Sequence, residues 1–266
     1  MLILNSYQLK WIAIVGMVLN HLVIGWWEAM PFWLALPLYA AGGVTFPIMA
    51  FLAVEGYKKT SDFTAYVGRL VWVGVIASLF HPLVFGMFMF NILFTLALGL
   101  LCIKFYDWLN GKWLFWLLFP LICLLTLTPI TFDWAITGLI MMVMYHVITN
   151  ENQRTVLPAL VMAIVHMILM VLGALAFNAA QSLLGTGEFD MLVTIATAGK
   201  GMDIFYLGFG FAIGMLAAIW FIRRYNGERG KPSKWLFYVI YPLHLALIGA
   251  VAVVMGWVDL SVFFPW

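Results

Sequence analysis

Long apolar segments separated by short polar connectors fill almost the whole chain. A helix needs about 20 apolar residues to cross about 30 Å of hydrocarbon, and nine segments approach this length. The start of the second segment is the least well defined, because Pro31 and Pro37 lie near it, so the number of spans could also be eight or ten. The pattern predicts an all-α polytopic membrane protein, a single domain over 1–266, with spans near 7–27, 34–56, 67–86, 88–106, 113–130, 133–149, 155–178, 202–222 and 235–256.

The composition agrees with this fold class and excludes others. Hydrophobic residues make up 65% of the chain and charged residues only 9%, with a mean hydropathy of +1.06. These values lie far outside the range of soluble domains. We therefore expect a lipid bilayer around the protein and no nucleic-acid partner. Cys102 and Cys123 lie inside apolar runs, so we interpret them as packing residues and expect neither a disulfide nor a metal site.

The basic residues are distributed unevenly over the ends of the predicted spans. Cytoplasmic loops of membrane proteins retain Lys and Arg. With a cytoplasmic N-terminus, twelve of the thirteen basic residues fall at cytoplasmic ends, and only Lys200 falls outside. The opposite orientation reverses this distribution. The sequence thus predicts a cytoplasmic N-terminus and a basic cytoplasmic surface, suited to anionic lipid or to an anionic cytosolic ligand.

Lys10 and His21 are ionisable residues inside the first apolar segment. Eleven helical steps of about 100° each bring the two side chains to one helix face, about 16 Å apart along the axis. Ionisable groups inside a membrane span are costly, and they usually face the interior of the bundle, where they mark a function. This pair is therefore the first candidate for a functional site.

Several stretches resemble the TraX family of F-type pilin acetylases. They are FPIMAFLAVEGYKKT at 46–60, the following Arg69, NILFTLALGLL at 91–101, YNGERG at 225–230 and FYVIYPLHL at 237–245. The resemblance implies an integral protein of the bacterial inner membrane that acetylates the N-terminus of pilin. It also implies a similarity to membrane-bound acyltransferases, in which a basic residue and a His share the first helix, as Lys10 and His21 do here.

One residue departs from the family pattern. The first helix of the family commonly carries Asp immediately before the His, and this chain has Asn20. An amide can donate or accept a hydrogen bond but brings no charge to the imidazole. The sequence leaves three explanations open. The chemistry tolerates Asn20, another carboxylate such as Glu55 supplies the charge, or the activity of this member has changed or been lost.

The resemblance implies acetyl transfer from cytoplasmic acetyl-CoA to an extracytoplasmic amine or hydroxyl, such as a pilin-like N-terminal amine. His21, with Asn20 and Glu55 beside it, is the expected catalytic group, because imidazole is the usual base for such a nucleophile. Phosphates of the cofactor need basic side chains. The candidates for cofactor binding are Lys10, Lys58, Lys59, Arg69, Arg223 and Arg224, and those for the acceptor or the oxyanion are Asn91, Asp133, Tyr241 and His244.

Some of these residues also have structural interpretations. Glu55 can pair with a nearby cation such as Arg69, and Asp133 can cap the helix that follows it. His244 is as readily structural as functional. We interpret His166 as a hydrogen-bonded packing residue and expect the other two histidines, His81 and His146, at the membrane interface.

Two other classes of protein fit the composition. A secondary transporter would also bury charges, but it is expected to show an internal repeat with broken helices in both halves, and the sequence shows none. A membrane scaffold or sensor without enzymatic activity would bind no cofactor. Binding of acetyl-CoA to the purified protein separates the acyltransferase from both alternatives.

Overall fold

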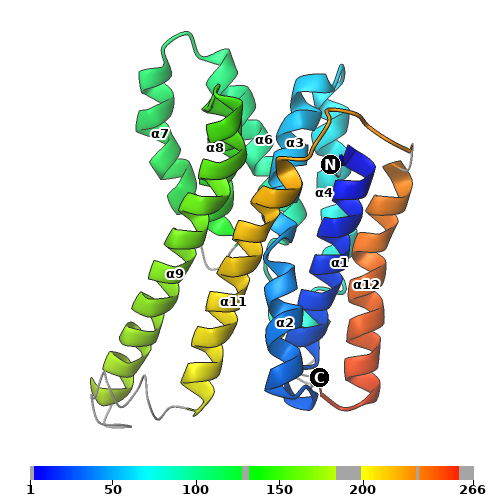
Figure 1. Ribbon diagram of the computed structural model, residues 1–266, viewed down its shortest axis with the longest axis vertical. Helices are drawn as coiled ribbons and strands as arrows, with labels where there is room; N and C mark the ends of the chain where they lie inside the picture. The colour runs from blue at the N-terminus through cyan, green and yellow to red at the C-terminus, as the bar shows by residue number, and fades with distance from the viewer. Residues whose placement is uncertain (1–2, 128–131, 184–198, 232–233, 258–266) are drawn as a thin grey trace.

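The computed structural model describes residues 3–127, 132–183, 199–231 and 234–257, and these residues are mainly helical (Figure 1). The described part contains no strand, and its only β-type pairings are isolated bridges between Leu4 and Tyr225 and between Phe90 and Phe132. The helices are α1 Ser6–Gly25, α2 Phe32–Gly42, α3 Thr45–Lys59, α4 Phe63–Ser78, α5 Pro82–Phe85, α6 Ile92–Trp108, α7 Lys112–Leu125, α8 Ala135–Val147, α9 Glu151–Leu183, α11 Gly199–Ile222 and α12 Lys234–Val254.

Each predicted span contains a helix, but the helices differ in length. Five stretches of the described chain are long and apolar enough to cross a membrane: Ser6–Gly25, Phe32–Lys59, Glu151–Leu172, Phe205–Ile222 and Trp235–Val254. The helices α4, α6, α7 and α8 have only 13 to 17 residues. The helical membrane fold is thus confirmed, whereas the count of nine spans stays a prediction.

The second apolar segment is broken into α2 and α3 at residues 43–44. Pro47 stands in the first turn of α3, where its missing N–H has no helical partner to lose. A continuous helix would instead place the proline ring against the carbonyl group of Gly43. The break therefore follows from Pro47 together with the two glycines, Gly42 and Gly43, that precede it.

Two glycines allow α11 to pack directly against this break. A Cβ atom added to Gly43 would lie 2.1 Å from the carbonyl oxygen of Phe211, and one added to Gly214 would lie 1.9 Å from that of Ala40. Both neighbours are backbone atoms and cannot move aside as a side chain would. The two backbones are thus in contact, as is typical of small residues at helix interfaces in membranes.

Polar contacts connect many helix ends at one end of the bundle. The N-terminus of α1 joins the segment after α11, where Leu4 N donates to Arg224 O at 2.8 Å. At the C-terminus of α3, Lys59 Nζ donates to Gly227 O, and Tyr57 donates to Asp107 on α6. We call this region the polar end; it lies toward the top in Figure 1, where α1 and α12 both begin.

We predict that Gly214→Ala destabilises the protein by about 1 to 3 kcal/mol, because the new methyl group overpacks a contact between two backbones. Gly68→Ala is the matched control, since a Cβ atom at Gly68 meets nothing within 4 Å. That change replaces a helical glycine by alanine at no steric cost and should leave stability equal or higher. Thermal unfolding in detergent measures both. Equal melting temperatures for the two variants would contradict the close approach.

Candidate functional site

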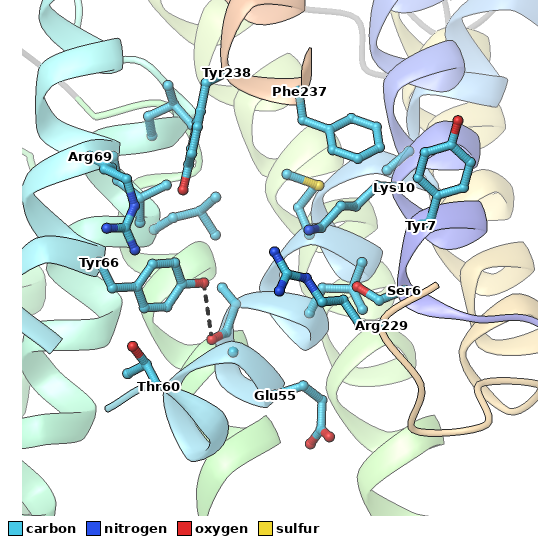
Figure 2. A pocket seen from close by; sticks show the side chains of 18 of the residues that line it. Ser6, Tyr7, Lys10, Glu55, Thr60, Tyr66, Arg69, Arg229, Phe237 and Tyr238 are labelled. Carbon is cyan, nitrogen blue, oxygen red and sulfur yellow. Dashed lines mark hydrogen bonds between the residues drawn. The ribbon is translucent and has the colours of Figure 1, made fainter. Parts of the chain in front are cut away.

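A cavity of about 670 Å³ lies at the polar end. Its walls come from α1, α3, α4, the start of α6, the segment 225–231 and α12 (Figure 2). Polar and basic groups lie toward the polar end of the cavity, whereas its deeper part is lined by apolar side chains such as Met17, Leu93 and Leu96. The cavity can therefore accept a molecule with a charged head and a less polar arm.

Three cations in this cavity lack a carboxylate partner. Lys10 on α1 and Arg229 in the segment after α11 extend into the cavity side by side, and Arg69 on α4 faces them from the other side (Figure 2). Within the described chain, none of the three has a carboxylate oxygen within 4 Å. Like charges that line one cavity repel each other, so an anion between them is stabilised.

Arg229 reaches the cavity because its segment is bound to the start of α1. Ser6 N donates to Glu228 O at 2.9 Å, and Tyr7 N donates to Arg229 O at 3.2 Å. These bonds satisfy two backbone donors that the first turn of a helix leaves free. Sequence reasoning noted the stretch YNGERG but did not assign Arg229 to the cofactor site.

The other predicted cofactor cations lie in different places. Lys59 lines the cavity and donates to Gly227 O at 2.7 Å, whereas Lys58 pairs with Glu55 at 3.5 Å and does not line it. Arg223 lines a separate cavity of about 380 Å³. The guanidinium of Arg224 stacks on the Trp220 ring, 3.6 Å from its centroid. The structure thus brings together Lys10, Lys59 and Arg69 of the predicted set.

Glu55 has a structural partner that differs from the expected one. Its carboxylate pairs with Arg154 on α9 and not with Arg69. Arg154 is 3% exposed, and it also donates to Tyr145 O at 2.8 Å and pairs with Glu151 at 2.9 Å. In Figure 2 the Glu55 carboxylate points away from Lys10. The pair connects α3 to α9 at the polar end, and it does not line the cavity that contains His21.

A second cavity, of about 270 Å³, lies deeper in the bundle; we call it the inner cavity. Its polar lining comes from distant parts of the chain: His21 and Asn20 on α1, Asp133 before α8, and His166 on α9. Aromatic side chains of Tyr39, Phe85, Trp134 and Phe211 surround them. The inner cavity therefore combines a few polar groups with an apolar wall, as ligand sites commonly do.

The two histidines His21 and His244 form one hydrogen-bonded pair. His21 Nδ1 lies 2.7 Å from His244 Nε2, and His244 Nδ1 lies 3.0 Å from the carbonyl oxygen of Ile240. A carbonyl only accepts, so His244 Nδ1 carries a hydrogen, and its Nε2 accepts one from His21 Nδ1 when both rings are neutral. This network leaves His21 Nε2 with its lone pair, on a ring that lines the inner cavity.

Three further polar side chains of the inner cavity are Asn20, Asp133 and His166. Asn20 Nδ2 and His166 Nε2 are buried without a hydrogen-bond partner in the described chain. The capping role considered for Asp133 is wrong, because the N-cap of α8 is Trp134 and no side chain caps it. His166 was interpreted as a hydrogen-bonded packing residue; its Nε2 has no partner in the described chain, and the residue lines this cavity.

Asn91 and Tyr241, the other candidates for the oxyanion, lie outside the inner cavity. Asn91 caps α6, accepting from Leu93 N at 3.1 Å and donating to Gly74 O at 2.8 Å, so its amide already has structural partners. Tyr241 lines the larger cavity and packs edge-on against His244, with ring centroids 5.5 Å apart. Neither is in the position of a donor beside His21.

The two histidines that were expected at the membrane interface differ from each other. His81 follows the end of α4, where it is only 1% exposed and stacks on Phe85, with ring centroids 4.0 Å apart. Its side chain is buried because the short helix α5 turns the chain back into the bundle, and its place at the membrane interface stays a prediction. His146 lies at the polar end, where its Nε2 is 2.8 Å from Asp107 Oδ1.

Fold and site together define an integral membrane protein of helices whose first and last helices carry a buried histidine pair beside a basic cavity. The family model described as TraX protein matches residues 5–252, so the chain belongs to the TraX family, as its motifs indicated. It is also similar to a protein of Dichelobacter nodosus named "Probable fimbrial assembly protein FimC, serogroup H1". The two are 27% identical over 264 residues, which cover 92% of this chain and 94% of that protein. No solved structure matches.

We predict that Glu55→Ala destabilises the protein by about 1 to 3 kcal/mol, because it removes a largely buried partner of the Arg154 guanidinium and leaves only the exposed Glu151 carboxylate paired with it. Glu151→Ala removes the other carboxylate of Arg154, but the Glu151 side chain is 72% exposed, so we expect a loss of less than about 1 kcal/mol. Thermal unfolding in detergent compares the two variants. A Glu55→Ala protein as stable as Glu151→Ala would show that the pair has no structural role.

Proposed function

We propose that this protein is a membrane acetyltransferase that moves the acetyl group of acetyl-CoA to an amine. The observation that carries the proposal is the buried His21–His244 pair, whose free nitrogen belongs to a cavity adjoining the basic one. Membership of the TraX family supports the proposal, because the resemblance to this family implies acetylation of pilin. The pair supplies a base, and the basic cavity supplies an anion site.

The basic cavity fits the phosphates of coenzyme A. Lys10, Arg69 and Arg229 line one space, and within the described chain none of them has a carboxylate oxygen within 4 Å. Guanidinium groups match the geometry of phosphate oxygens, and an ammonium group adds a compact charge. His21 lies about 16 Å along α1 from Lys10. The pantetheine arm of the cofactor would cover this distance along the apolar wall, so that the thioester arrives beside the imidazole.

In the proposed reaction His21 Nε2 is the general base. The nitrogen of a neutral amine attacks the thioester carbonyl carbon, and His21 takes one N–H proton as the C–N bond forms. Asn20 Nδ2, which has no other partner in the described chain, donates to the developing oxyanion. The C–S bond then breaks, and the departing thiolate takes the proton from the imidazolium, which gives an amide and free coenzyme A.

His244 is a positioning residue in this scheme. By accepting from His21 Nδ1 it selects the tautomer in which Nε2 is free, a role that a carboxylate fulfils in many catalytic histidines. The departure at Asn20 is then compatible with activity, because orientation of the ring does not depend on an acid at that position. Of the three explanations for Asn20, we propose that the chemistry tolerates it.

The acceptor would enter the inner cavity from the side opposite the polar end. Asp133 lines this cavity, and a carboxylate there favours an amine over a hydroxyl acceptor by attracting its ammonium form. We propose a pilin-like N-terminal amine, in line with the family and with the name of the relative, which refers to fimbrial assembly.

The polar end is the proposed cytoplasmic side of a bacterial inner membrane. Lys10, Lys59 and Arg69 lie there with the segment 223–231, so the excess of basic residues at one end supports a cytoplasmic N-terminus. The side chain of Lys200, the single exception in the sequence, lies outside the described part. Acetyl-CoA would then reach its cavity from the cytosol.

We predict that His21→Ala lowers acetyl transfer by about 100-fold or more, the usual contribution of a general base. Membranes containing the variant are incubated with isotopically labelled acetyl-CoA and an amine-bearing peptide, and the labelled product is counted. His146→Ala is the matched control, because His146 lies at the polar end and lines neither cavity. Equal transfer by wild type and His21→Ala would refute the mechanism.

We also predict that Arg69→Gln weakens binding of acetyl-CoA by about tenfold or more, because it removes a charge-assisted hydrogen bond to phosphate. Lys104→Gln is the control of equal charge change, since Lys104 lies over the Phe63 ring and does not line the cavity. Thermal shift against acetyl-CoA concentration gives both affinities. If the wild-type protein binds no acetyl-CoA, a non-enzymatic scaffold is favoured, or a secondary transporter if the protein moves a solute across the membrane.

A further inference from the structure

The basic cavity and the inner cavity share three side chains. Met17 on α1, Thr45 at the start of α3 and Ile92 at the start of α6 line both. All three are buried, with exposed fractions of 7%, 6% and 6%. They therefore form the boundary between the basic cavity, which holds Lys10, Arg69 and Arg229, and the inner cavity, which holds the His21 imidazole.

One face of α1 runs along both cavities and places Met17 at this boundary. Lys10, Ala13 and Ile14 line the basic cavity, and Asn20, His21 and Ile24 line the inner one. Met17 lies about 10 Å from Lys10 and about 6 Å from His21 along the helix axis. Because side chains four residues apart are neighbours on a helix, a group that approaches the His21 ring from the basic cavity must pass Met17.

The backbone at the boundary is fixed on two sides. A Cβ atom at Gly16 would lie 2.6 Å from the carbonyl oxygen of Ala41, so α1 is already in close contact with the end of α2. Thr45 Oγ1 donates to Ala13 O at 3.0 Å, which holds the start of α3 against α1. Helix movement therefore cannot widen the boundary without breaking these contacts.

Among the three boundary side chains, only Met17 is easily rearranged. Thr45 and Ile92 are β-branched and stiff, and the Thr45 hydroxyl is occupied by its hydrogen bond. Met has an unbranched side chain with three rotatable bonds and a polarizable sulfur, so it adapts to groups of different shape. The size and rotamers of Met17 thus determine how wide an opening the boundary can form.

We propose that Met17, against Thr45 and Ile92, selects the acyl group by its width as the acyl end of the thioester passes from the basic cavity into the inner one. An unbranched acetyl group passes, whereas a branched acyl group meets the Met17 side chain. The inference rests on the proposed acetyl transfer, and it adds a determinant of donor specificity that neither the cations nor the histidines supply.

The test compares acetyl-CoA with isobutyryl-CoA as donors for the full-length protein in membranes. In Met17→Ala the ratio of kcat/KM for isobutyryl-CoA to that for acetyl-CoA should rise by roughly tenfold or more, the usual effect of the fit of one or two carbon atoms. Met17→Phe should lower acetyl transfer by about tenfold or more without weakening coenzyme A binding, because the phosphate site is unchanged.

Met141→Ala is the matched control, because Met141 is fully buried on α8 and lines neither cavity. The Met141→Ala change removes the same side-chain atoms as Met17→Ala, and this variant should keep the wild-type ratio of kcat/KM for isobutyryl-CoA to that for acetyl-CoA. If Met17→Ala does not fold, Met17→Val removes fewer atoms and provides the same ratio.

The outcomes separate the two proposals. An unchanged donor ratio in an active Met17→Ala protein, or full acetyl transfer by Met17→Phe, would overturn the role of Met17 and leave the proposed function standing. The same change of ratio in Met141→Ala would also overturn it, since the effect would then be one of general packing. If the wild type transfers no acetyl group while binding no acetyl-CoA, the proposed function itself fails.

Discussion

The hydrogen bond between His21 and His244 is the interaction on which the candidate site depends. It joins the first described helix to the last across 223 residues of sequence, in a region where both side chains are less than 9% exposed. Both nitrogens of His244 have partners, since its other one faces the carbonyl oxygen of Ile240. A buried hydrogen-bonded pair has a defined geometry, and here the geometry leaves His21 Nε2 without a partner in the described chain, on a ring that lines the inner cavity.

Close packing at the break between α2 and α3 holds this pair in place. Gly42 approaches the Asn20 side chain so closely that an added Cβ atom would lie 2.4 Å from Asn20 Cβ, and Gly43 has the contact with α11 described above. One face of α1 is thereby fixed against the break, and the neighbouring face presents Met17 and His21 to the cavities. The broken helix is thus part of the site, because Gly42 and Thr45 on either side of the break contact α1 while Gly43 contacts α11.

The helices could be predicted from the sequence because the signals for them are local. Apolar length located the helical segments but merged α2 with α3 and α4 with α5, and an ionisable residue in an apolar segment identified Lys10 and His21. The partners could not be found in this way. Glu55 and Arg154 are 99 residues apart, and His21 and His244 are farther apart still, so only the tertiary fold pairs them. Arg229 was missed because a charge in a polar connector is ordinarily solvated, and nothing local shows that the connector binds the start of α1.

The separation of the cations from the imidazole explains why the two cavities differ. Unpaired cations are costly in hydrocarbon, so they are stable only near a membrane surface, which water reaches. A neutral imidazole has a much smaller cost of burial, provided its N–H group has an acceptor, and His244 is that acceptor. The deep site therefore needs no counter-ion beside His21. An Asp at position 20 would add a second acidic group to the inner cavity beside Asp133, whereas Asn20 contributes a donor without a charge, and for this reason the amide suits the proposed neutral base.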